Sequence, residues 1–171
     1  MEKRCQCELP YPPVEVTCPD PRWLPPLRDL YAGQHSELSA IAQYCFQSFV
    51  LSRDHGELAK LLRSIAIVEM HHLEMLGRLI CLCGGVPDFA GGSPRRWWNG
   101  SCLNYRQDLC GALAASMADE TAAVDAYRRA ACLIGDPKIQ ELLRRIAMDE
   151  ELHVRLLREA LAQCGCPRQQ G

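Results

Sequence analysis

The sequence predicts an all-α protein: a four-helix bundle made of two antiparallel helical hairpins joined by a long crossover. Three observations lead to this prediction. Four long segments carry apolar residues at helical spacing, and glycine and proline lie mainly between them. Only a few residues link the first pair of segments and the second pair, as in helical hairpins. About 20 residues separate the two pairs, which is long enough to run the length of a bundle.

The N-terminal part of the chain is unsuited to helix. Seven of the eleven prolines fall within residues 10–26, and proline is excluded from helix interiors. Residues 1–26 are therefore expected to form an extended Pro-rich arm, residues 27–164 the bundle, and residues 165–171 a short C-terminal tail.

Helix boundaries follow from capping and breaking residues. The fourth helix is expected to open at Asp136-Pro137, an N-cap followed by proline at the first helical position, and to end near Cys164. The other three helices are expected over residues 27–51, 55–83 and 105–134. The crossover then covers about residues 86–104, where Trp97-Trp98 either fixes the crossover to the bundle or makes a subunit contact.

The two hairpins resemble each other in sequence. Residues 37–44 (ELSAIAQY) align with residues 120–127 (ETAAVDAY), and residues 61–72 align with residues 142–153. An internal repeat of this kind predicts an approximate two-fold axis between the hairpins.

Glutamate interrupts the apolar face of every predicted helix near its middle, and histidine joins it in two of the four. A buried carboxylate is costly, and four at one level of a core would repel one another unless cations compensated them. Glu-x-x-His places both side chains on one helix face. A glutamate from each of two helices, with Glu-x-x-His from the other two, is the ligand pattern of di-iron and di-manganese bundles. The predicted ligands of two divalent metal ions, iron or manganese, are Glu37, Glu69, His72, Glu120, Glu150 and His153.

The repeat also predicts how these ligands divide between the two metals. By symmetry, Glu69 and Glu150 are expected to bridge both ions. Glu37 and His72 would complete one half of the site, and Glu120 and His153 the other half. The alternative is that the four glutamates lie on the surface and share this spacing by coincidence.

Three further residues are candidates for supporting roles in catalysis. Tyr44 and Tyr127 each lie seven residues after a predicted ligand glutamate, so each either donates to a ligand carboxylate or is an ordinary core aromatic. Asp149 could accept a hydrogen bond from His72, whereas Val68 occupies the matching position of the repeat. The two metal halves are therefore expected to be inequivalent.

These motifs resemble the rubrerythrin and manganese-catalase branch of the ferritin-like superfamily. The paired Glu-x-x-His motifs carry the resemblance, together with Leu9-Pro-Tyr-Pro-Pro-Val, Pro19-Asp-Pro-Arg and Glu37-Leu-Ser-Ala. It implies a ferritin-like fold, dinuclear iron or manganese, homo-oligomers, and reactions with peroxide or dioxygen. Two features differ from rubrerythrins, which carry an additional glutamate where Ala123 stands here and usually a Cys-x-x-Cys module.

The function expected from these residues is that of an oxidoreductase acting on peroxide or dioxygen. Two alternatives are iron oxidation for storage and a structural metal-binding bundle without turnover. A third is oxygenation of an organic substrate, which would need an apolar channel to the metals.

Composition limits the partners and the cellular compartment that are expected. The net charge is −2 and no block of like charges occurs, so neither a nucleic-acid nor a membrane partner is expected. The eleven cysteines and the absence of an apolar signal segment at residues 1–13 predict reduced thiols in a cytoplasmic protein. The alternative for the Cys-x-Cys pairs is a redox pair or a second metal site; these pairs stand at residues 5/7, 81/83 and 164/166.

Overall fold

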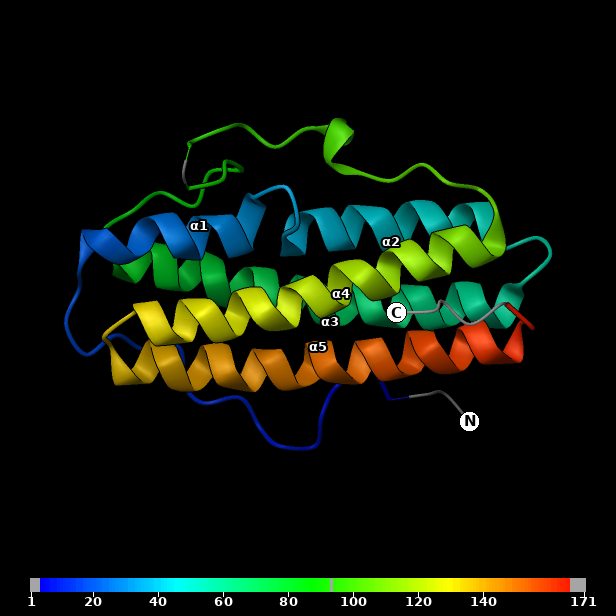
Figure 1. The fold of residues 1–171 in the computed structure, drawn as a ribbon. Coiled ribbons are helices and arrows are strands. Elements are labelled where there is room, and N and C mark those ends of the chain that lie inside the picture. Colours follow the sequence, from blue (N-terminus) through cyan, green and yellow to red (C-terminus); the bar gives the residue numbers. More distant parts are fainter. Residues whose placement is uncertain (1–3, 93, 167–171) are drawn as a thin grey trace.

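The computed structural model describes residues 4–92 and 94–166 of the chain. These residues form the helices α1 (Leu24–Ala32), α2 (Glu37–Leu51), α3 (Gly56–Leu82), α4 (Leu109–Leu133) and α5 (Pro137–Gln163). A short 3-10 turn, η1 (Pro21–Trp23), precedes α1. A second one, η2 (Gly100–Cys102), lies in the crossover. Helices α1 and α2 follow one another along one side of the bundle (Figure 1). The prediction of a four-helix bundle made of two hairpins with a long crossover is confirmed.

The single helix predicted over residues 27–51 is wrong, because the chain breaks between α1 and α2. A Cβ atom on Gly33 would lie 2.5 Å from the carbonyl oxygen of Asp29, so only glycine fits the end of α1. Ser36 then caps α2 by accepting a hydrogen bond from the N–H of Ser39. Glu37 is consequently the first residue of α2, where a carboxylate interacts favourably with the helix dipole.

The third predicted helix begins four residues later than expected, at Leu109 instead of Tyr105. Asp108 caps α4 through its side chain, which accepts from the N–H of Gly111. The residues before it are held by α2 instead, since the Gln43 side chain exchanges two hydrogen bonds of 2.7 Å with the backbone of Asn104.

Trp98 also fixes the crossover to α2. Its indole nitrogen donates to the Ser39 hydroxyl at 2.9 Å. Trp97, in contrast, is 68% exposed. The two neighbouring tryptophans therefore differ in role, and of the two it is the Trp98 side chain that fastens the crossover to α2.

The bundle core consists of two apolar clusters, one toward each end. Near the α1 end it includes Leu76, Leu79, Ile139 and other residues of α1, α3, α4 and α5. Toward the other end it includes residues such as Leu62, Ile65, Leu113 and Leu157. Complete burial of each such side chain stabilises the fold by about 1.5–3 kcal/mol. The predicted metal ligands lie between these clusters along their helices.

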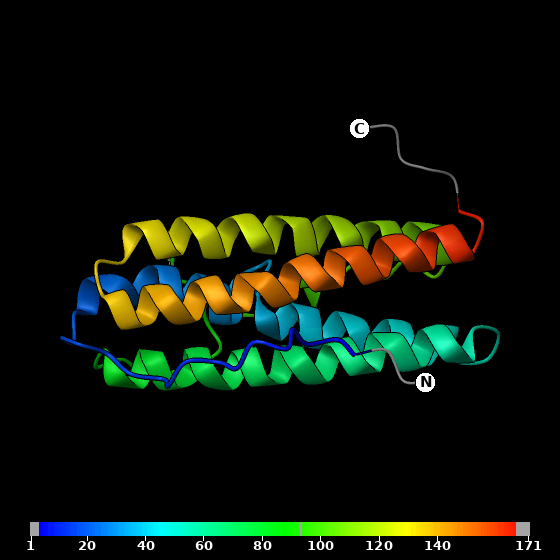
Figure 2. The same cartoon turned by 90° about the horizontal axis from the view of Figure 1, so that it is seen from below.

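The N-terminal arm runs lengthwise beside α3 and α5, as Figure 2 shows. Asp136 fastens one part of it. Its carboxylate caps α5 by accepting from the N–H groups of Lys138 and Ile139, and it also accepts from the N–H groups of Thr17 and Cys18 in the arm. One buried carboxylate thus joins the arm to the start of α5.

The expectation of reduced thiols is wrong for two cysteines. Cys110 in the first turn of α4 and Cys166 after α5 form a disulfide with a Cα–Cα distance of 5.5 Å. The other nine cysteines are in no disulfide. The disulfide ties the segment that follows α5 to the hairpin partner α4.

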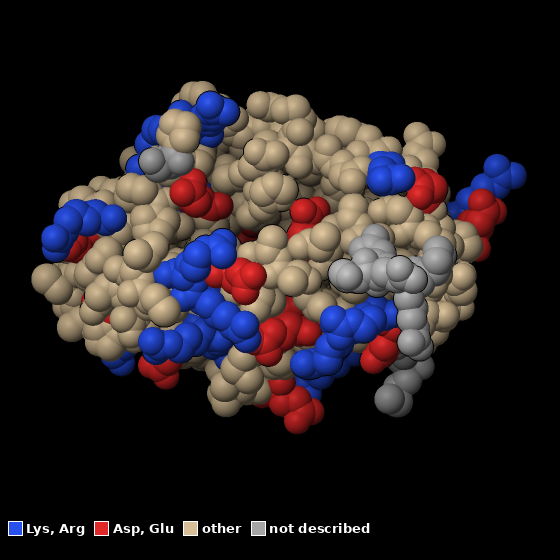
Figure 3. Space-filling view, viewed as in Figure 1, with Lys and Arg blue, Asp and Glu red and all other residues tan. Residues whose placement is uncertain are grey.

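The surface carries charges of both signs. Figure 3 shows lysine and arginine interspersed with aspartate and glutamate over the face viewed, as expected for a net charge of −2. Among the described residues, no helix has the length and apolar character needed to cross a bilayer.

Replacing Asp136 with alanine is expected to lower the free energy of unfolding by about 2 kcal/mol, since a helix cap and two arm hydrogen bonds are lost. Burial raises the pKa of Asp136, but hydrogen bonds from backbone N–H groups outweigh it and hold the pKa below its ordinary value of 3.8. The stabilisation is therefore present at neutral pH and lost as the pH falls below about 4. Urea denaturation at several pH values measures both effects.

Asp125→Ala is the control, because Asp125 is exposed on α4. Its unfolding free energy should stay within about 0.5 kcal/mol of the parent chain. An equal loss in both variants, or a loss in Asp136→Ala that persists unchanged below pH 4, would contradict this assignment.

Candidate metal centre

All six predicted ligand residues come together in the middle of the bundle. Two groups of four side chains form, and in each the possible ligand atoms lie within 4.8 Å of one another. The His72 half contains Glu37, Glu69, His72 and Glu150. The His153 half contains Glu69, Glu120, Glu150 and His153. Every one of these side chains is buried, and no other such group exists among the described residues.

Glu69 and Glu150 belong to both halves, and the orientation of their oxygens explains why. Glu69 directs Oε2 toward His72 Nδ1 and Oε1 toward His153 Nδ1, with both distances 2.9 Å. Glu150 likewise places Oε1 3.1 Å from His72 Nδ1 and Oε2 3.4 Å from His153 Nδ1. Each carboxylate therefore spans the two halves, as a bridging ligand does.

The outer glutamates each face one histidine. Glu37 Oε2 lies 3.6 Å from His72 Nδ1, and Glu120 Oε2 lies 3.7 Å from His153 Nδ1. Tyr127 donates to Glu37, and Tyr44 donates to Glu120. Each tyrosine thus holds the outer glutamate of the opposite hairpin, so the hydrogen bonds cross between α2 and α4.

The Nε2 atom of each imidazole contacts a different kind of group. His153 Nε2 lies 2.8 Å from the carbonyl oxygen of Cys5 in the arm. A carbonyl oxygen can only accept, so Nε2 carries a proton, and deprotonation of the ring for metal binding would free Nδ1, which faces the carboxylates. His72 Nε2 lies 3.2 Å from Asp149 Oδ2 and 3.1 Å from the Tyr11 hydroxyl. The two halves are therefore inequivalent in their surroundings.

Arg145 holds the arm over the histidines. This buried side chain donates to the backbone carbonyls of Leu9 and Cys7, at 2.7 and 3.1 Å. Its guanidinium lies 4.4 Å from the centre of the Tyr11 ring and 2.9 Å from Asp149 Oδ2. In the aligned repeat, Ser64 replaces Arg145 and Val68 replaces Asp149. Both departures from the repeat lie on α5, one turn apart, where the arm crosses.

Burial and neighbouring charges set the protonation of the cluster. Burial and then the negative charges of Glu69 and Glu150 raise the pKa values of Glu37 and Glu120 well above normal. Burial alone would raise the pKa of Glu69 as well, but the two imidazoles outweigh it and hold the pKa below the ordinary value. The carboxylates likewise raise both histidine pKa values despite burial.

The donor set fits two divalent cations. The buried atoms Glu69 Oε1, Glu150 Oε1 and His153 Nδ1 have no hydrogen-bond partner although they face the cluster. Four carboxylates carry four negative charges, which two divalent ions balance while displacing protons from the ligands. Oxygen and imidazole donors suit iron and manganese.

A cavity of about 50 Å³ leads to the carboxylates from the side opposite the arm. Residues of the break between α1 and α2, including His35 and Ser36, form part of its lining. So do Ala40 and Ala123, which occupy matching positions of the repeat one turn after Glu37 and Glu120. The volume suffices for a few molecules the size of water.

Comparisons with known proteins agree with this geometry. Residues 4–88 match the family model described as manganese containing catalase. The crystal structure of KatB, a manganese catalase from Anabaena, superposes with a TM-score of 0.83 and 27% identity over 97% of this chain and 83% of that chain. A mycobacterial bacterioferritin structure gives a TM-score of 0.70 and 28% identity over 85% of this chain and 86% of that chain. No curated protein sequence gives a significant match.

The fold and the site together define a helical bundle with a dinuclear carboxylate centre. The chain belongs to the ferritin-like superfamily of dimetal carboxylate proteins. This agrees with the resemblance that the paired Glu-x-x-His motifs and the arm sequence carry.

Sequence reasoning missed three contributors to the site: the Cys5 carbonyl, Tyr11 and Arg145. The first two lie in an arm whose path the sequence does not reveal. Arg145 had a usable signal, because it replaces the serine of the first repeat. Two polar neighbours of the ligands in sequence lie outside the site: His71 is exposed, and Glu151 forms an ion pair with Arg128.

Asp149→Asn is expected to weaken metal binding in the His72 half by roughly 10–100-fold, as loss of a partner to a ligand histidine does. Burial raises the pKa of Asp149, but hydrogen bonds from His72, Tyr11 and the N–H of Cys7 lower it to about 2. An asparagine cannot replace the charge. Titration with Mn²⁺ measures the affinity of each half.

The His153 half is the internal control, because its imidazole is held by a backbone carbonyl that the substitution leaves in place. Exposed Asp125→Asn controls for the change of charge. Equal weakening of both halves would contradict the proposed division.

Proposed function

We propose that the chain is a redox enzyme that decomposes or reduces hydrogen peroxide at a dinuclear manganese or iron centre. The observation that carries the proposal is the pair of carboxylates shared between two halves at the floor of a small cavity. The ligands of the two metal ions are Glu37, Glu69, His72, Glu120, Glu150 and His153. Two such ions, held by these residues, would supply the redox chemistry for reaction with peroxide.

The cavity favours a small substrate over an organic one. A volume of about 50 Å³ accepts peroxide or dioxygen but no larger molecule without rearrangement. Alanine at position 123 leaves this space open beside Glu120. The similarity to a manganese catalase supports peroxide as the substrate.

Tyr44 and Tyr127 would act by positioning. Each hydroxyl donates to the outer glutamate that faces one imidazole, so the carboxylate keeps its other oxygen for a metal ion. Burial and the adjacent carboxylates raise both tyrosine pKa values well above normal, so both stay protonated donors. Asp149 orients His72 in the same way.

The second candidate is iron oxidation for storage, favoured by the similarity to bacterioferritin. A storage protein would form a cage and retain many iron atoms per chain. A catalase or peroxidase would hold two metal ions per chain and consume peroxide continuously. Mass determination in solution together with iron loading separates these functions.

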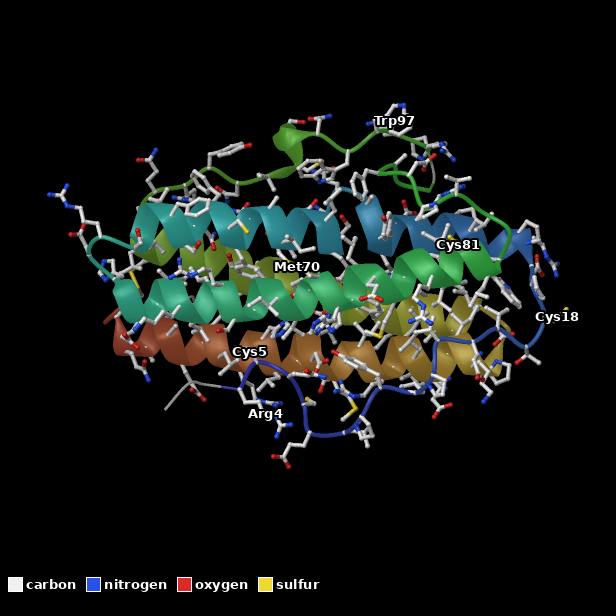
Figure 4. All side chains as sticks on the ribbon, turned by 180° about the vertical axis from the view of Figure 1, so that it is seen from behind. Arg4, Cys5, Cys18, Met70, Cys81 and Trp97 are labelled. Atoms are coloured by element: carbon white, nitrogen blue, oxygen red, sulfur yellow. A yellow bond between two sulfur atoms is a disulfide. The ribbon has the colours of Figure 1, made fainter. Side chains whose placement is uncertain are left out.

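We infer a cytoplasmic homo-oligomer as the working form. Apolar side chains exposed on α2, α3 and the crossover, such as Phe49, Met70 and Trp97, support subunit contacts. Figure 4 shows Met70 and Trp97 on different parts of the surface. The nine cysteines outside disulfides support a reducing compartment. Residues 4–26 of the arm and the bundle would fold as one unit.

The chain purified without added metal is expected to contain two manganese or iron ions and to consume hydrogen peroxide. Glu69→Ala and Glu150→Ala should each lose both ions, because each removes a ligand common to both halves. Elemental analysis and peroxide absorbance measure the two effects. Replacing exposed Glu74 with alanine is the control. Retention of both metals in Glu69→Ala, or a metal-loaded parent chain without peroxide turnover, would refute the proposal.

Ala123→Leu should lower peroxide turnover by roughly tenfold or more while metal content stays unchanged, since the added side chain obstructs the approach to the reacting centre. Ala122→Leu changes an exposed position of the same helix and should turn over normally. Steady-state kinetics with parallel metal analysis measures the effect. Full activity of Ala123→Leu would show that substrate enters elsewhere.

A further inference from the structure

The Cys-x-Cys pair of the arm lies directly against the metal centre. The backbone carbonyl of Cys5 accepts from His153 Nε2 at 2.8 Å. The backbone N–H of Cys7 donates to Asp149 Oδ1 at 2.7 Å, and Asp149 Oδ2 lies 3.2 Å from His72 Nε2. Each cysteine is thereby connected to the histidine of a different half.

We propose that Cys5 and Cys7 are a dithiol that supplies two electrons to the dimetal centre, which makes the protein a thiol-dependent peroxidase. This inference rests on the proposed reaction with peroxide. A dinuclear centre exchanges two electrons, and the pair offers one short bonded route to each half. One route runs through the Cys5 carbonyl and His153, and the other through Cys7, Asp149 and His72.

The surroundings of the two sulfurs differ in a way that suits this role. The Cys5 side chain is buried among apolar residues of the core, such as Tyr44 and Leu156. The Cys7 side chain is half-buried, and its sulfur lies 3.2 Å from the carbonyl oxygen of Met148. Cys5 is thus shielded from solvent, whereas an external thiol can reach Cys7 and reduce the pair again by exchange.

The backbone between the two cysteines permits a disulfide. The chain bends at Gln6. A disulfide spans a Cα–Cα distance of about 4.4–6.8 Å, which residues i and i+2 meet whenever the chain between them is less than fully extended, since full extension gives roughly 7 Å. Neither Cys5 nor Cys7 is in a disulfide, so the structure represents the reduced form of the pair.

The reaction balances without another reductant. The two thiols lose two electrons and two protons as the sulfur–sulfur bond forms. Hydrogen peroxide accepts both electrons and both protons, its oxygen–oxygen bond breaks, and two water molecules result. An external thiol, such as dithiothreitol in the assay, then returns the disulfide to the dithiol.

The test follows the two sulfurs by mass spectrometry. Manganese-loaded protein receives hydrogen peroxide, is alkylated and is cleaved after Arg4 and Arg22, which releases a peptide containing Cys5, Cys7 and Cys18. We expect the loss of two alkylatable thiols, assigned by fragmentation to Cys5 and Cys7, with Cys18 still alkylated. Metal-free protein should oxidise these thiols much more slowly, and dithiothreitol should restore them.

Variants separate electron supply from support of the histidines. In the double variant Cys5→Ser, Cys7→Ser the backbone carbonyl and N–H remain, so both metal ions should be retained by elemental analysis while dithiothreitol-driven peroxide reduction is lost. Cys81→Ser is the matched control, since Cys81 is exposed and lies far along α3 from Cys5 (Figure 4).

Three results would overturn the inference. Peroxide consumption that leaves both thiols alkylatable would do so, and so would equally fast oxidation in metal-free protein. Unchanged dithiothreitol-driven turnover in the double variant is the third. The proposed function survives any of these results if the metal-loaded double variant consumes peroxide and the metal-free double variant does not. If the parent chain consumes no peroxide, the proposed function fails and this inference fails with it.

Discussion

Four carboxylates buried at one level of an apolar core must be neutralised, and the rest of the structure is arranged around that requirement. Charges in a medium of low dielectric constant repel strongly and lose their hydration. Here two imidazoles and two tyrosine hydroxyls face the four glutamates, and the ligand atoms form two groups that could each hold a metal ion. The apolar clusters toward either end of the bundle hold the helices that carry these groups.

The metal ligands follow the symmetry of the repeat, whereas the residues that hold the two histidines from the arm side do not. The duplicated hairpin supplies matching glutamates, histidines and tyrosines, so each half of the centre is a near copy of the other. The arm crosses only one face, and there the repeat is broken. Arg145 and Asp149 have no polar counterpart of the same kind on α3, since Ser64 and Val68 stand in their places. One histidine is consequently held by a carboxylate and the other by a backbone carbonyl.

Helical periodicity and the repeat were sufficient to predict the bundle, its hairpins and the six side chains that converge. They did not predict features where capping and breaking residues interrupt a regular helical pattern. The helical spacing of Leu30, Gln34, Glu37 and Ile41 continues across residues 33–36, so the break between α1 and α2 was overlooked although glycine and a capping serine were both present. Contacts of the arm join residues far apart in the sequence, such as Cys7 and Asp149, which are 142 positions apart, and no local pattern encodes them. The pairing of Cys110 with Cys166 was equally inaccessible, since spacing alone does not determine disulfide connectivity.

The central claim is that two metal ions lie between Glu69 and Glu150, each on the Nδ1 atom of one histidine. Anomalous scattering from crystals of the chain, recorded on either side of the iron and manganese absorption edges, tests it directly. Two peaks are expected within the cluster, one beside His72 Nδ1 and one beside His153 Nδ1, with both carboxylates touching both peaks. A single peak, or metal bound at Nε2 in place of the arm and Asp149, would contradict it.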